Sequence, residues 1–428
     1  MGLLIYNFLI TLAFSTYQIL ARIHPKVKVF HQHRQEGKTR IKNFLSRQKE
    51  RKILWLHASS VGELDQALAL FRFIKKLHPQ IPVLITVFSE SVKNLDKIPS
   101  DEKAYLPIDF PWQWKFLNDK VLAFITFTWD VFPNLLKTLK LKNTYTFLCS
   151  AAIEKDSYKI RNRSFFRFLY ENLDGIGVVD EENLIHFQKL YSGNIKITGD
   201  TRYETIYYKL QNQSLKKEFE EKLQIDQEII ILASTYTKCE EELLPHLSNL
   251  IKETQRKVWI FPHFVQEKRI HEIKERLNQY QIPYVVFSDE EFFRKYQASQ
   301  VVIVDVLGIL AYAYTRSKIC YVGGAFHHRV HNTGEPAFCG SIPFTGPRIY
   351  ASPTAVLLEK HQFLFSHSNG KSLIQHMIQL LKDPITLNSK REEMIKLVSS
   401  QLGASEKFYH EFLRKVIVSS QKFHSLSS

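Results

Sequence analysis

The stretch Ile319-Cys-Tyr-Val-Gly-Gly-Ala-Phe-His-His-Arg-Val-His-Asn-Thr-Gly-Glu-Pro-Ala-Phe-Cys-Gly-Ser-Ile-Pro-Phe-Thr-Gly-Pro347 carries the pattern that decides the fold. Ile319 to Val322 is a short apolar run that predicts a buried strand, and Gly323-Gly324 ends it. Glu335-Pro336 predicts a helix start, because the first helical turn tolerates proline. Ile342-Pro343-Phe344 predicts the next strand. A strand, a glycine loop and a helix N-terminus with one carboxylate favour a nucleotide, since the helix end attracts phosphate and the carboxylate accepts hydrogen bonds from a ribose diol.

The same alternation of strands and helices extends over the chain from Lys52 onward. Apolar runs are separated by segments with apolar residues at helical spacing, such as Leu64 to Leu77. Near-continuous apolar strands indicate parallel sheets that are covered on both faces. The predicted strands are 53–56, 82–88, 121–127, 144–148, 175–179, 195–198, 229–233, 258–261, 284–287, 301–305, 319–322 and 342–344. A polar helical stretch at 206–225 separates two series, so we expect two facing, doubly wound α/β domains that bind ligands at the carboxyl ends of their strands.

Length, charge and cysteine content limit the class of protein. A chain of 428 residues is long enough for two domains with separate cores, and 44% hydrophobic content is typical of a globular protein. The net charge of +15 is spread over many segments, which favours an anionic membrane surface or a phosphorylated substrate over nucleic acid. The four cysteines are far apart and form no CxxC pair, which indicates a reduced, cytosolic protein without disulfides.

The N-terminal segment differs from the rest of the chain. Gly2 to Leu20 is nearly uncharged and rich in Leu, Ile and Phe, and a basic flank follows from Arg22 to Arg34. About 19 residues are just enough to span a bilayer core of ~30 Å, and the basic flank places the remainder in the cytoplasm. We expect a membrane helix within residues 1–30 and no cleaved signal peptide. The alternative is a helix that lies on the membrane or packs on a domain, because polar residues dilute the run.

The first series of strands offers one candidate catalytic loop, His57-Ala-Ser-Ser-Val-Gly-Glu63. It follows a predicted strand, and Glu63 is expected at or near the start of the next helix. A carboxylate there can act as a general base towards a substrate hydroxyl. The alternative is that Glu63 is a first-turn residue favoured only by the helix dipole. His57 is expected to be structural.

The second series offers further candidates. Pro262-His263 follows a strand, so His263 is expected either to contact a phosphate or to face solvent. Asp305 to Leu310 predicts a strand end, a loop and a helix start, which suits an anion. His327-His328-x-x-His331 suggests a metal, but no acidic or cysteine residues accompany it, which favours ordinary loop histidines. The chain has no Walker A segment, no G-x-G-x-x-G fingerprint and no convincing nucleophile elbow.

Taken in order, several of these segments resemble the Kdo transferases of lipid A biosynthesis, which attach 3-deoxy-D-manno-octulosonic acid (Kdo) to a lipid A precursor. The likeness covers nearly the whole chain, and its specificity lies in the ordered set. Besides the N-terminal segment, the matching residues are Trp55–Glu63, Tyr105–Asp109, Phe132–Asn134, Gly199–Tyr203, Ala233–Thr235, Pro262-His263, Gly308–Leu310, Val322–Gly324 and His331–Pro336. The resemblance implies a GT-B glycosyltransferase with two Rossmann-like domains, the donor nucleotide on the C-terminal one, and neither cofactor nor metal.

The resemblance also implies roles for individual residues. Glu63 matches the family's general base, which deprotonates the acceptor hydroxyl as CMP leaves and the configuration inverts. Asp130 and Arg202 match positions suited to transition-state stabilisation. The segments matching donor (CMP) binding are Pro262, His263, Gly308, Ile309, Leu310, Asn332, Thr333, Gly334 and Glu335.

Three departures from the family pattern affect these roles. Asp130 stands where a glutamate is usual, and His263 stands where arginine is frequent. Ser150-Ala151-Ala152 replaces a common Asn-Ala-Arg, which removes a basic side chain. Most of the departures fall in the acceptor half, so the acceptor structure is the part put in doubt.

The expected organisation follows from these observations. It comprises a membrane anchor at 1–30, an acceptor domain at 31–205, a linker helix at 206–225, a CMP-sugar domain at 226–390 and C-terminal helices at 391–428 that pack back on the first domain. The expected partners are CMP-Kdo and a lipid A precursor at the cytoplasmic face of the inner membrane, without nucleic acid. Two alternatives remain open: a GT-B transferase or epimerase that uses a UDP-sugar, and a relative that binds nucleotide or lipid without turnover.

Overall fold

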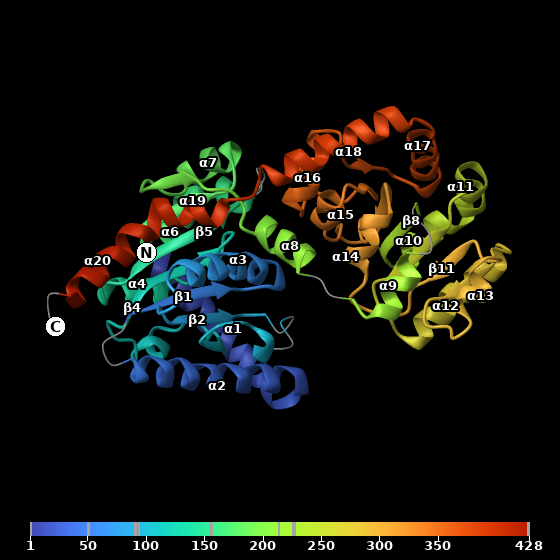
Figure 1. The fold of residues 1–428 in the computed structure, drawn as a ribbon. Coiled ribbons are helices and arrows are strands. Elements are labelled where there is room, and N and C mark those ends of the chain that lie inside the picture. The colour runs from blue at the N-terminus through green and yellow to red at the C-terminus, as the bar shows by residue number, and fades with distance from the viewer. Residues whose placement is uncertain are drawn as a thin grey trace. The chain divides into compact units, whose positions relative to one another are not determined.

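The computed structural model describes residues 2–48, 52–89, 92, 95–153, 157–212, 215–224 and 228–425, with backbone only at 15–21, 23, 26 and 421–425. The chain divides into two compact units (Figure 1). Unit 1 holds Met1–Thr205 and Gln401–Ser428, and unit 2 holds Ile206–Ser400. Each unit is built on a seven-stranded sheet in which all pairings are parallel.

The sheet of unit 1 has the strand order β3-β2-β1-β4-β5-β6-β7. Its strands are β1 (Ile53–Ala58), β2 (Val83–Val87), β3 (Glu102–Tyr105), β4 (Val121–Phe127), β5 (Tyr145–Ala151), β6 (Gly175–Val178) and β7 (Ile195–Ile197). Successive side chains of a strand point to opposite faces, and the core divides accordingly. Leu54 and Leu56 belong to one hydrophobic cluster, whereas Ile53 and Trp55 belong to the other. Both faces are therefore covered, as the apolar strands predict.

Helices from distant parts of the chain cover unit 1. Within its first 205 residues these are α1 (Gly2–Ile23), α2 (Pro25–Arg47), α3 (Val61–Leu77), α4 (Pro133–Leu141), α5 (Tyr158–Arg161), α6 (Arg163–Tyr170), α7 (Glu181–Gln188) and the start of α8 (Arg202–Gln211), with short 3-10 turns η1 (Leu95–Lys97) and η2 (Pro111–Trp114). The C-terminal segment adds α19 (Ala404–Phe408), the π-helical turn η5 (Tyr409–Leu413) and α20 (Arg414–Ser425). Figure 1 shows α19 and α20 lying across this unit, where Phe408 and Phe412 join the cluster that contains α3.

The two N-terminal helices pack on unit 1. α2 lies against the edge strand β3, where Gly37 permits close approach, because a Cβ there would lie 2.0 Å from the Tyr105 carbonyl oxygen. In α1, Tyr6 donates a hydrogen bond to Asp109 (3.0 Å), and the Phe14 ring meets Phe110 edge-on at 4.6 Å. No helix among the described residues is long and apolar enough to cross a membrane. Tyr6 and Phe14, which belong to the run expected to form a membrane helix, thus contact unit 1.

The sheet of unit 2 has the strand order β10-β11-β9-β8-β12-β13-β14. Its strands are β8 (Ile230–Thr235), β9 (Val258–Pro262), β10 (Tyr284–Val286), β11 (Val301–Ile303), β12 (Ile319–Val322), β13 (Ile342–Thr345) and β14 (Phe365–Ser366). The helices are α9 (Lys217–Gln224), α10 (Thr237–Leu243), α11 (Leu247–Thr254), α12 (Glu267–Gln279), α13 (Phe292–Tyr296), α14 (Leu310–Ala313), α15 (Gly334–Phe338), α16 (Pro353–Lys360), α17 (Gly370–Lys382) and α18 (Pro384–Ser399), with turns η3 (Leu244–His246) and η4 (Tyr314–Arg316). This strand–helix alternation is the one that the apolar runs predict.

Two expected boundaries need correction. The stretch at 206–225 is not one linker helix: it contains the end of α8 and the whole of α9, and unit 2 begins at Ile206. The C-terminal segment at 391–428 is divided, because residues 391–400 stay with unit 2 and Gln401 onward joins unit 1. Arg391 shows why the first part stays, since its Nε donates to the Gly340 carbonyl oxygen (2.6 Å) within unit 2.

Candidate active site

Glu63 lies where the strand order of unit 1 turns. β1 has β2 on one side and β4 on the other, so the loops after β1 and β4 flank the crevice in which open parallel sheets bind ligands. Ser60 caps α3 by accepting the Glu63 N–H (3.3 Å), and the Ser59 N–H donates to Glu63 Oε2 (2.5 Å). The carboxylate is buried and fixed by this turn. Glu63 is therefore a first-turn residue, as one interpretation expected, and its carboxylate lies at the carboxyl end of the strands, where the other interpretation requires it.

Asp130 shares this edge with Glu63 and perturbs it. Burial first, and the charge of Asp130 second, raise the pKa of the Glu63 carboxyl to about 8, against hydrogen bonds from Ser59 and Ser60 and the charge of Arg202. Burial raises the pKa of Asp130 as well, against a hydrogen bond from the Ser59 hydroxyl and the charge of Lys159. Two neighbouring carboxyl groups that resist joint ionisation retain a proton near neutral pH. Such a pair suits proton transfer near neutrality.

The turn after β4 positions Asp130. Thr128 adopts φ 62, a left-handed conformation that is uncommon for a threonine and concentrates at functional sites. Its hydroxyl donates to Gln66 Oε1 of α3 (3.0 Å), and the Thr126 hydroxyl donates to the Asp130 carbonyl oxygen (2.9 Å). These bonds tie the loop after β4 to the helix that begins beside Glu63.

Arg202 completes the set that the resemblance assigns to unit 1. Its N–H donates to Asp200 Oδ1 (2.9 Å), which also accepts Gln66 Nε2 (2.9 Å). A Cβ on Gly62 would lie 3.7 Å from Arg202 Nη2, so the guanidinium lies beside the turn that precedes Glu63. Glu63 and Arg202, from the first turns of α3 and α8, are thus brought together with Asp130 from the loop after β4.

Lys159 of α5 is a fourth charged group at this edge, and sequence reasoning missed it. The ammonium lies 3.7 Å from the centroid of the Trp129 ring. Burial lowers the pKa of Lys159 to about 8, and the charge of Asp130 opposes this shift. A cation over an aromatic ring and beside a carboxylate is held in place. Lys159 therefore supplies a basic side chain near the segment in which Ala152 stands where the family pattern has an arginine. The sequence indicated this only through Trp129 and Asp130, the two residues that Lys159 contacts or faces.

Asp109, part of the matching segment Tyr105–Asp109, has a structural role. Its carboxylate accepts four hydrogen bonds: from Tyr6 Oη, Trp114 Nε1 and the N–H groups of Asn134 and Leu135, at 2.8 to 3.0 Å. It therefore caps the N-terminus of α4 and holds α1 and η2 against it. The matching segments at 105–109 and 132–134 are thus two halves of one hydrogen-bonded joint.

In unit 2 the strand order turns between β8 and β12. Gly323, which follows β12, approaches β8 so closely that a Cβ would lie 2.1 Å from the Ser234 carbonyl oxygen. Gly324 adopts φ 100, which an L side chain rarely does. The glycine loop predicted from the sequence thus brings backbone to the ligand-binding edge.

Asn332 organises the short helix after this loop. Its Oδ1 accepts the Gly334 N–H (2.9 Å), and its Nδ2 donates to Glu335 Oε1 (3.1 Å), which orients the carboxylate. Thr333 is fully buried. α15 begins at Gly334 and has five residues. The expected helix end that attracts phosphate is weaker than predicted, because so short a helix has a small macrodipole.

Gly308, Ile309 and Leu310 lead into α14, which has four residues. Gly308 adopts φ 90, and Ile309 is buried. The Cys339 thiol donates to the Ala311 carbonyl oxygen (3.6 Å), which joins α14 to the end of α15. These residues therefore adjoin the Asn332–Glu335 segment, although α14 is too short to form a strong dipole.

His263 belongs to an aromatic cluster that the sequence did not indicate. Its ring stacks on His331 (4.5 Å) and on Tyr236 (4.7 Å), and the Tyr236 hydroxyl is 3.0 Å from His331 Nε2. His327 meets Tyr236 at 4.5 Å. Burial first and neighbouring His263 second lower the pKa of His331 to about 4, and burial lowers the pKa of His263 and His327. The cluster is therefore neutral at pH 7 and places Pro262-His263 beside Asn332.

The arrangement of these rings does not form a metal centre. Over the described ranges, no group of three or more histidine, cysteine, aspartate or glutamate side chains is placed to hold an ion. The rings stack face to face in place of converging with their nitrogens, and stacking is the arrangement that binds planar groups.

Comparisons with known proteins relate the chain to one family. Residues 33–205 match the family described as 3-Deoxy-D-manno-octulosonic-acid transferase (kdotransferase). The chain is 25% identical over 378 residues to the 3-deoxy-D-manno-octulosonic acid transferase of Rickettsia felis, which covers 86% of this chain and 79% of that protein. It is 26% identical over 311 residues to the protein of the same name from Chlamydophila psittaci, covering 69% and 70%.

Solved structures agree on the fold. A UDP-GlcNAc 2-epimerase from Neisseria meningitidis bound to UDP-GlcNAc matches with a TM-score of 0.57 at 13% identity, over 82% of this chain and 99% of that one. At this identity the match shows the fold alone. Together with two parallel α/β units it supports the GT-B class.

Proposed function

We propose that this chain, a glycosyltransferase of the Kdo transferase family, transfers Kdo from CMP-Kdo to a lipid A precursor with inversion of configuration. The observation that carries the proposal is the buried pair Glu63 and Asp130 beside Arg202 and Lys159. It supplies a base with a pKa near neutrality, and two cations for the charge that develops as the sugar leaves its phosphate.

The proposed step uses unit 1 for the chemistry. The Glu63 carboxylate accepts the proton of an acceptor hydroxyl, whose oxygen forms a bond to the anomeric carbon of Kdo. The bond from that carbon to the phosphate oxygen breaks, and the electron pair leaves with CMP. Asp130 keeps the Glu63 pKa raised, while Arg202 and Lys159 stabilise the negative charge of the transition state.

Unit 2 would hold the donor. Glu335, oriented by Asn332, accepts hydrogen bonds from the ribose hydroxyls, and the backbone at Gly323-Gly324 and Gly308 approaches the phosphate. The neutral rings of His263, His331 and Tyr236 offer hydrogen bonds and a flat surface to the nucleotide. Supporting this placement is the position of all these residues at one edge of one sheet.

The proposed location is the cytoplasmic face of the inner membrane, where α1 lies on the lipid surface. Leu4, Phe8 and Leu12 are 75%, 69% and 59% exposed and recur at four-residue spacing, so they form an apolar ridge on the outer side of α1. An amphipathic helix with such a ridge and a basic neighbour suits an anionic membrane surface.

Mass spectrometry of the products tests the function. A tetra-acylated, phosphorylated lipid A precursor is incubated with the protein and CMP-Kdo, or with UDP-sugars. We expect products heavier by Kdo units with CMP-Kdo only. Transfer from a UDP-sugar would replace the proposed donor, and no transfer from either donor would favour a binding protein without turnover.

A further inference from the structure

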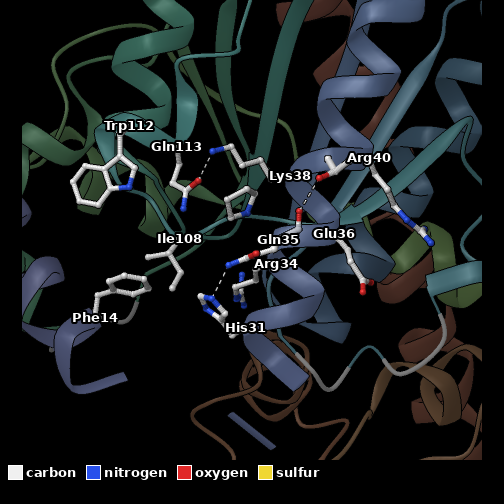
Figure 2. Close-up of a pocket in the computed structure, with 12 residues that line it drawn as sticks. Phe14, His31, Arg34, Gln35, Glu36, Lys38, Arg40, Ile108, Trp112 and Gln113 are labelled. Atoms are coloured by element: carbon white, nitrogen blue, oxygen red, sulfur yellow. Dashed lines mark hydrogen bonds between the residues drawn. The ribbon is translucent and has the colours of Figure 1, made fainter. Parts of the chain in front are cut away.

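A cavity of about 890 Å³ in unit 1 has no role in the proposed reaction. It lies between α1, α2 and the segment that runs from Pro107 into η2, and none of the predicted site residues lines it. Figure 2 shows Phe14, Ile108 and Trp112 on one side of it, with His31, Arg34 and Lys38 of α2 facing them. One wall is therefore apolar and the opposite wall is basic.

The basic wall is rigid. The Arg34 side chain is buried, and its carbon Cζ lies 3.8 Å from the ring centroids of both Phe30 and Phe88. Its guanidinium also donates to the carbonyl oxygens of Phe88 (2.5 Å) and Leu106. A cation held between two rings adds a fixed positive charge beside the cavity.

Lys38 lies at the mouth of the cavity and is held by a neutral partner. Its Nζ donates to Gln113 Oε1 (2.8 Å) of η2, a partner that carries no charge. Among the ion pairs of the described residues, none involves Lys38. Glu36, the single acidic residue of α2, instead accepts a hydrogen bond from Gln32 (2.8 Å). Glu36 also lines the cavity, but among the described interactions it is bonded to Gln32 and Lys38 to Gln113, so the two charged groups do not pair with each other.

The apolar wall shares α1 with the exposed ridge of Leu4, Phe8 and Leu12. Phe14 comes two residues after Leu12 and therefore lies on the other side of the helix, where it packs on Phe110. Trp112 is 50% exposed and stacks on Phe110 at 4.4 Å, so a flat ring is presented at the rim. A tryptophan at the rim, basic groups inside and an apolar ridge alongside match the layers of a lipid monolayer, with headgroup next to acyl chain.

We propose that the cavity between α1 and α2 binds the phosphorylated headgroup of an anionic bilayer phospholipid. The phosphate accepts hydrogen bonds from Lys38, the Arg34 charge attracts it, and the acyl chains lie along the ridge of α1. This inference rests on the proposed membrane attachment and adds a specific lipid site to it. A bilayer phospholipid is favoured over a soluble phosphate because a soluble phosphate would leave the apolar wall and the apolar ridge without an apolar partner.

A matched pair of variants tests this site. Lys42 lies one turn beyond Lys38 on α2, is exposed and does not line the cavity, so Lys38→Gln and Lys42→Gln remove the same charge from the same helix. Binding to phosphatidylglycerol vesicles is measured by co-sedimentation, with phosphatidylcholine vesicles as reference. We expect Lys38→Gln to weaken binding by about 30-fold, as for a lost charged hydrogen bond. Lys42→Gln should weaken it by about fivefold or less, the effect of one surface charge. Lys38→Arg should restore binding.

A second readout locates the lipid. A headgroup-labelled phosphatidylglycerol that quenches tryptophan fluorescence should quench Trp112, and Trp112→Phe should abolish that part of the quenching. Equal losses in Lys38→Gln and Lys42→Gln, or no preference for phosphatidylglycerol, would overturn the proposal. Displacement of the lipid by inorganic phosphate with the same Lys38 dependence would assign the cavity to a free anion, and binding only to vesicles that contain the lipid A precursor would assign it to the acceptor.

These measurements contain neither donor nor acceptor. A wild-type protein that binds phosphatidylglycerol through Lys38 but transfers no sugar in detergent would contradict the proposed function alone. A protein that transfers sugar but shows equal losses in the two variants would contradict only the lipid site.

Discussion

The carboxyl edges of the two sheets share one topology but differ in charge: the edge of unit 1 carries several charged side chains, and the edge of unit 2 carries mainly uncharged ones. In unit 1 the loops at the turn of the strand order present four buried or half-buried charged groups, Glu63, Asp130, Lys159 and Arg202. In unit 2 the equivalent edge presents stacked rings whose pKa values are lowered, an asparagine and glycine backbone, with Glu335 as its carboxylate. Groups that titrate near pH 7 are costly to bury and suit chemistry, whereas neutral groups suit holding a ligand. This difference supports the proposal that catalysis belongs to unit 1 and donor binding to unit 2.

The largest effect is expected from a substitution that removes the proposed base of unit 1. Glu63→Gln keeps the size and the hydrogen-bond acceptor but cannot accept a proton at neutral pH. We expect the rate of sugar transfer to fall by about 10³-fold, within the range for loss of a general base. Initial rates from product mass spectrometry measure it, and Glu171→Gln, which changes an exposed carboxylate at the end of α6 in the same unit, is the control. A variant that retains full rate would exclude Glu63 as the base.

Asp109, another buried carboxylate of unit 1, is expected to stabilise the fold without taking part in the reaction. Asp109→Ala leaves the donors of Tyr6, Trp114 and the start of α4 without an acceptor in the interior. We expect a loss of about 3 kcal/mol in the free energy of unfolding of unit 1. Thermal unfolding should show an earlier transition, while CMP binding by unit 2 persists below it. An unchanged transition would contradict the joint between α1, η2 and α4.

The pH profile distinguishes the two units. Transfer requires ionised Glu63, whose pKa is raised to about 8, so the ionised fraction is about 50-fold lower at pH 6 than at pH 8 and kcat/KM should rise with pH. Lys159, whose pKa is lowered to about 8, loses its charge above that value, which gives a falling limb. CMP affinity should change little from pH 6.5 to 9, because burial holds the pKa of His331 at about 4 and lowers the pKa of His263 and His327 below its ordinary value. A flat rate profile with a sloping affinity would reverse the assignment.

Lys159 itself offers a smaller effect with an internal control. Lys159→Met keeps the chain length but removes the charge that lies over Trp129 and beside Asp130. We expect kcat to fall by about 30-fold, as for loss of one group that stabilises transition-state charge. Lys159→Arg should recover most of the rate and lose the alkaline limb, because arginine keeps its charge. Equal rates in Lys159→Met and the wild type would make the lysine structural.

The smallest expected effect concerns unit 2. Glu335→Ala should weaken CMP binding by about 1–3 kcal/mol if the carboxylate accepts hydrogen bonds from ribose. Calorimetry with CMP and with the 2′-deoxynucleotide measures this loss. The substitution should lower the affinity for the deoxynucleotide much less than the affinity for CMP. Wild-type affinity for CMP in Glu335→Ala would remove the ribose role.

Much of this fold follows from the sequence, because buried parallel strands are apolar on both faces and stand out as continuous runs. Strand β3 was missed since Glu102 and Lys103 make it polar at the sheet edge. The contacts of α1 with unit 1 were missed because hydropathy does not reveal that Tyr6 and Asn7 bind Asp109 and Asn134. Helices and strands with a characteristic residue pattern could thus be predicted from the sequence, whereas the contacts between them could not.

The candidate site divides in the same way. Glu63, Asp130 and Arg202 were identified by resemblance, and the loops that carry them do meet. Lys159 and Tyr236 belong to no motif and become recognisable only when the fold brings them to Asp130 and His263. The helix at Glu335 was predicted correctly in place but not in length, because proline and glycine mark where a helix starts without showing how soon it ends.

Calorimetric titration of Glu63→Gln with CMP tests the division of labour most directly. If chemistry belongs to unit 1 and donor binding to unit 2, the substitution leaves the CMP site unchanged. The variant that has lost transfer then binds CMP with a dissociation constant within about twofold of that of the wild type. A CMP affinity that falls in parallel with the transfer rate would place Glu63 in donor binding and contradict the assignment.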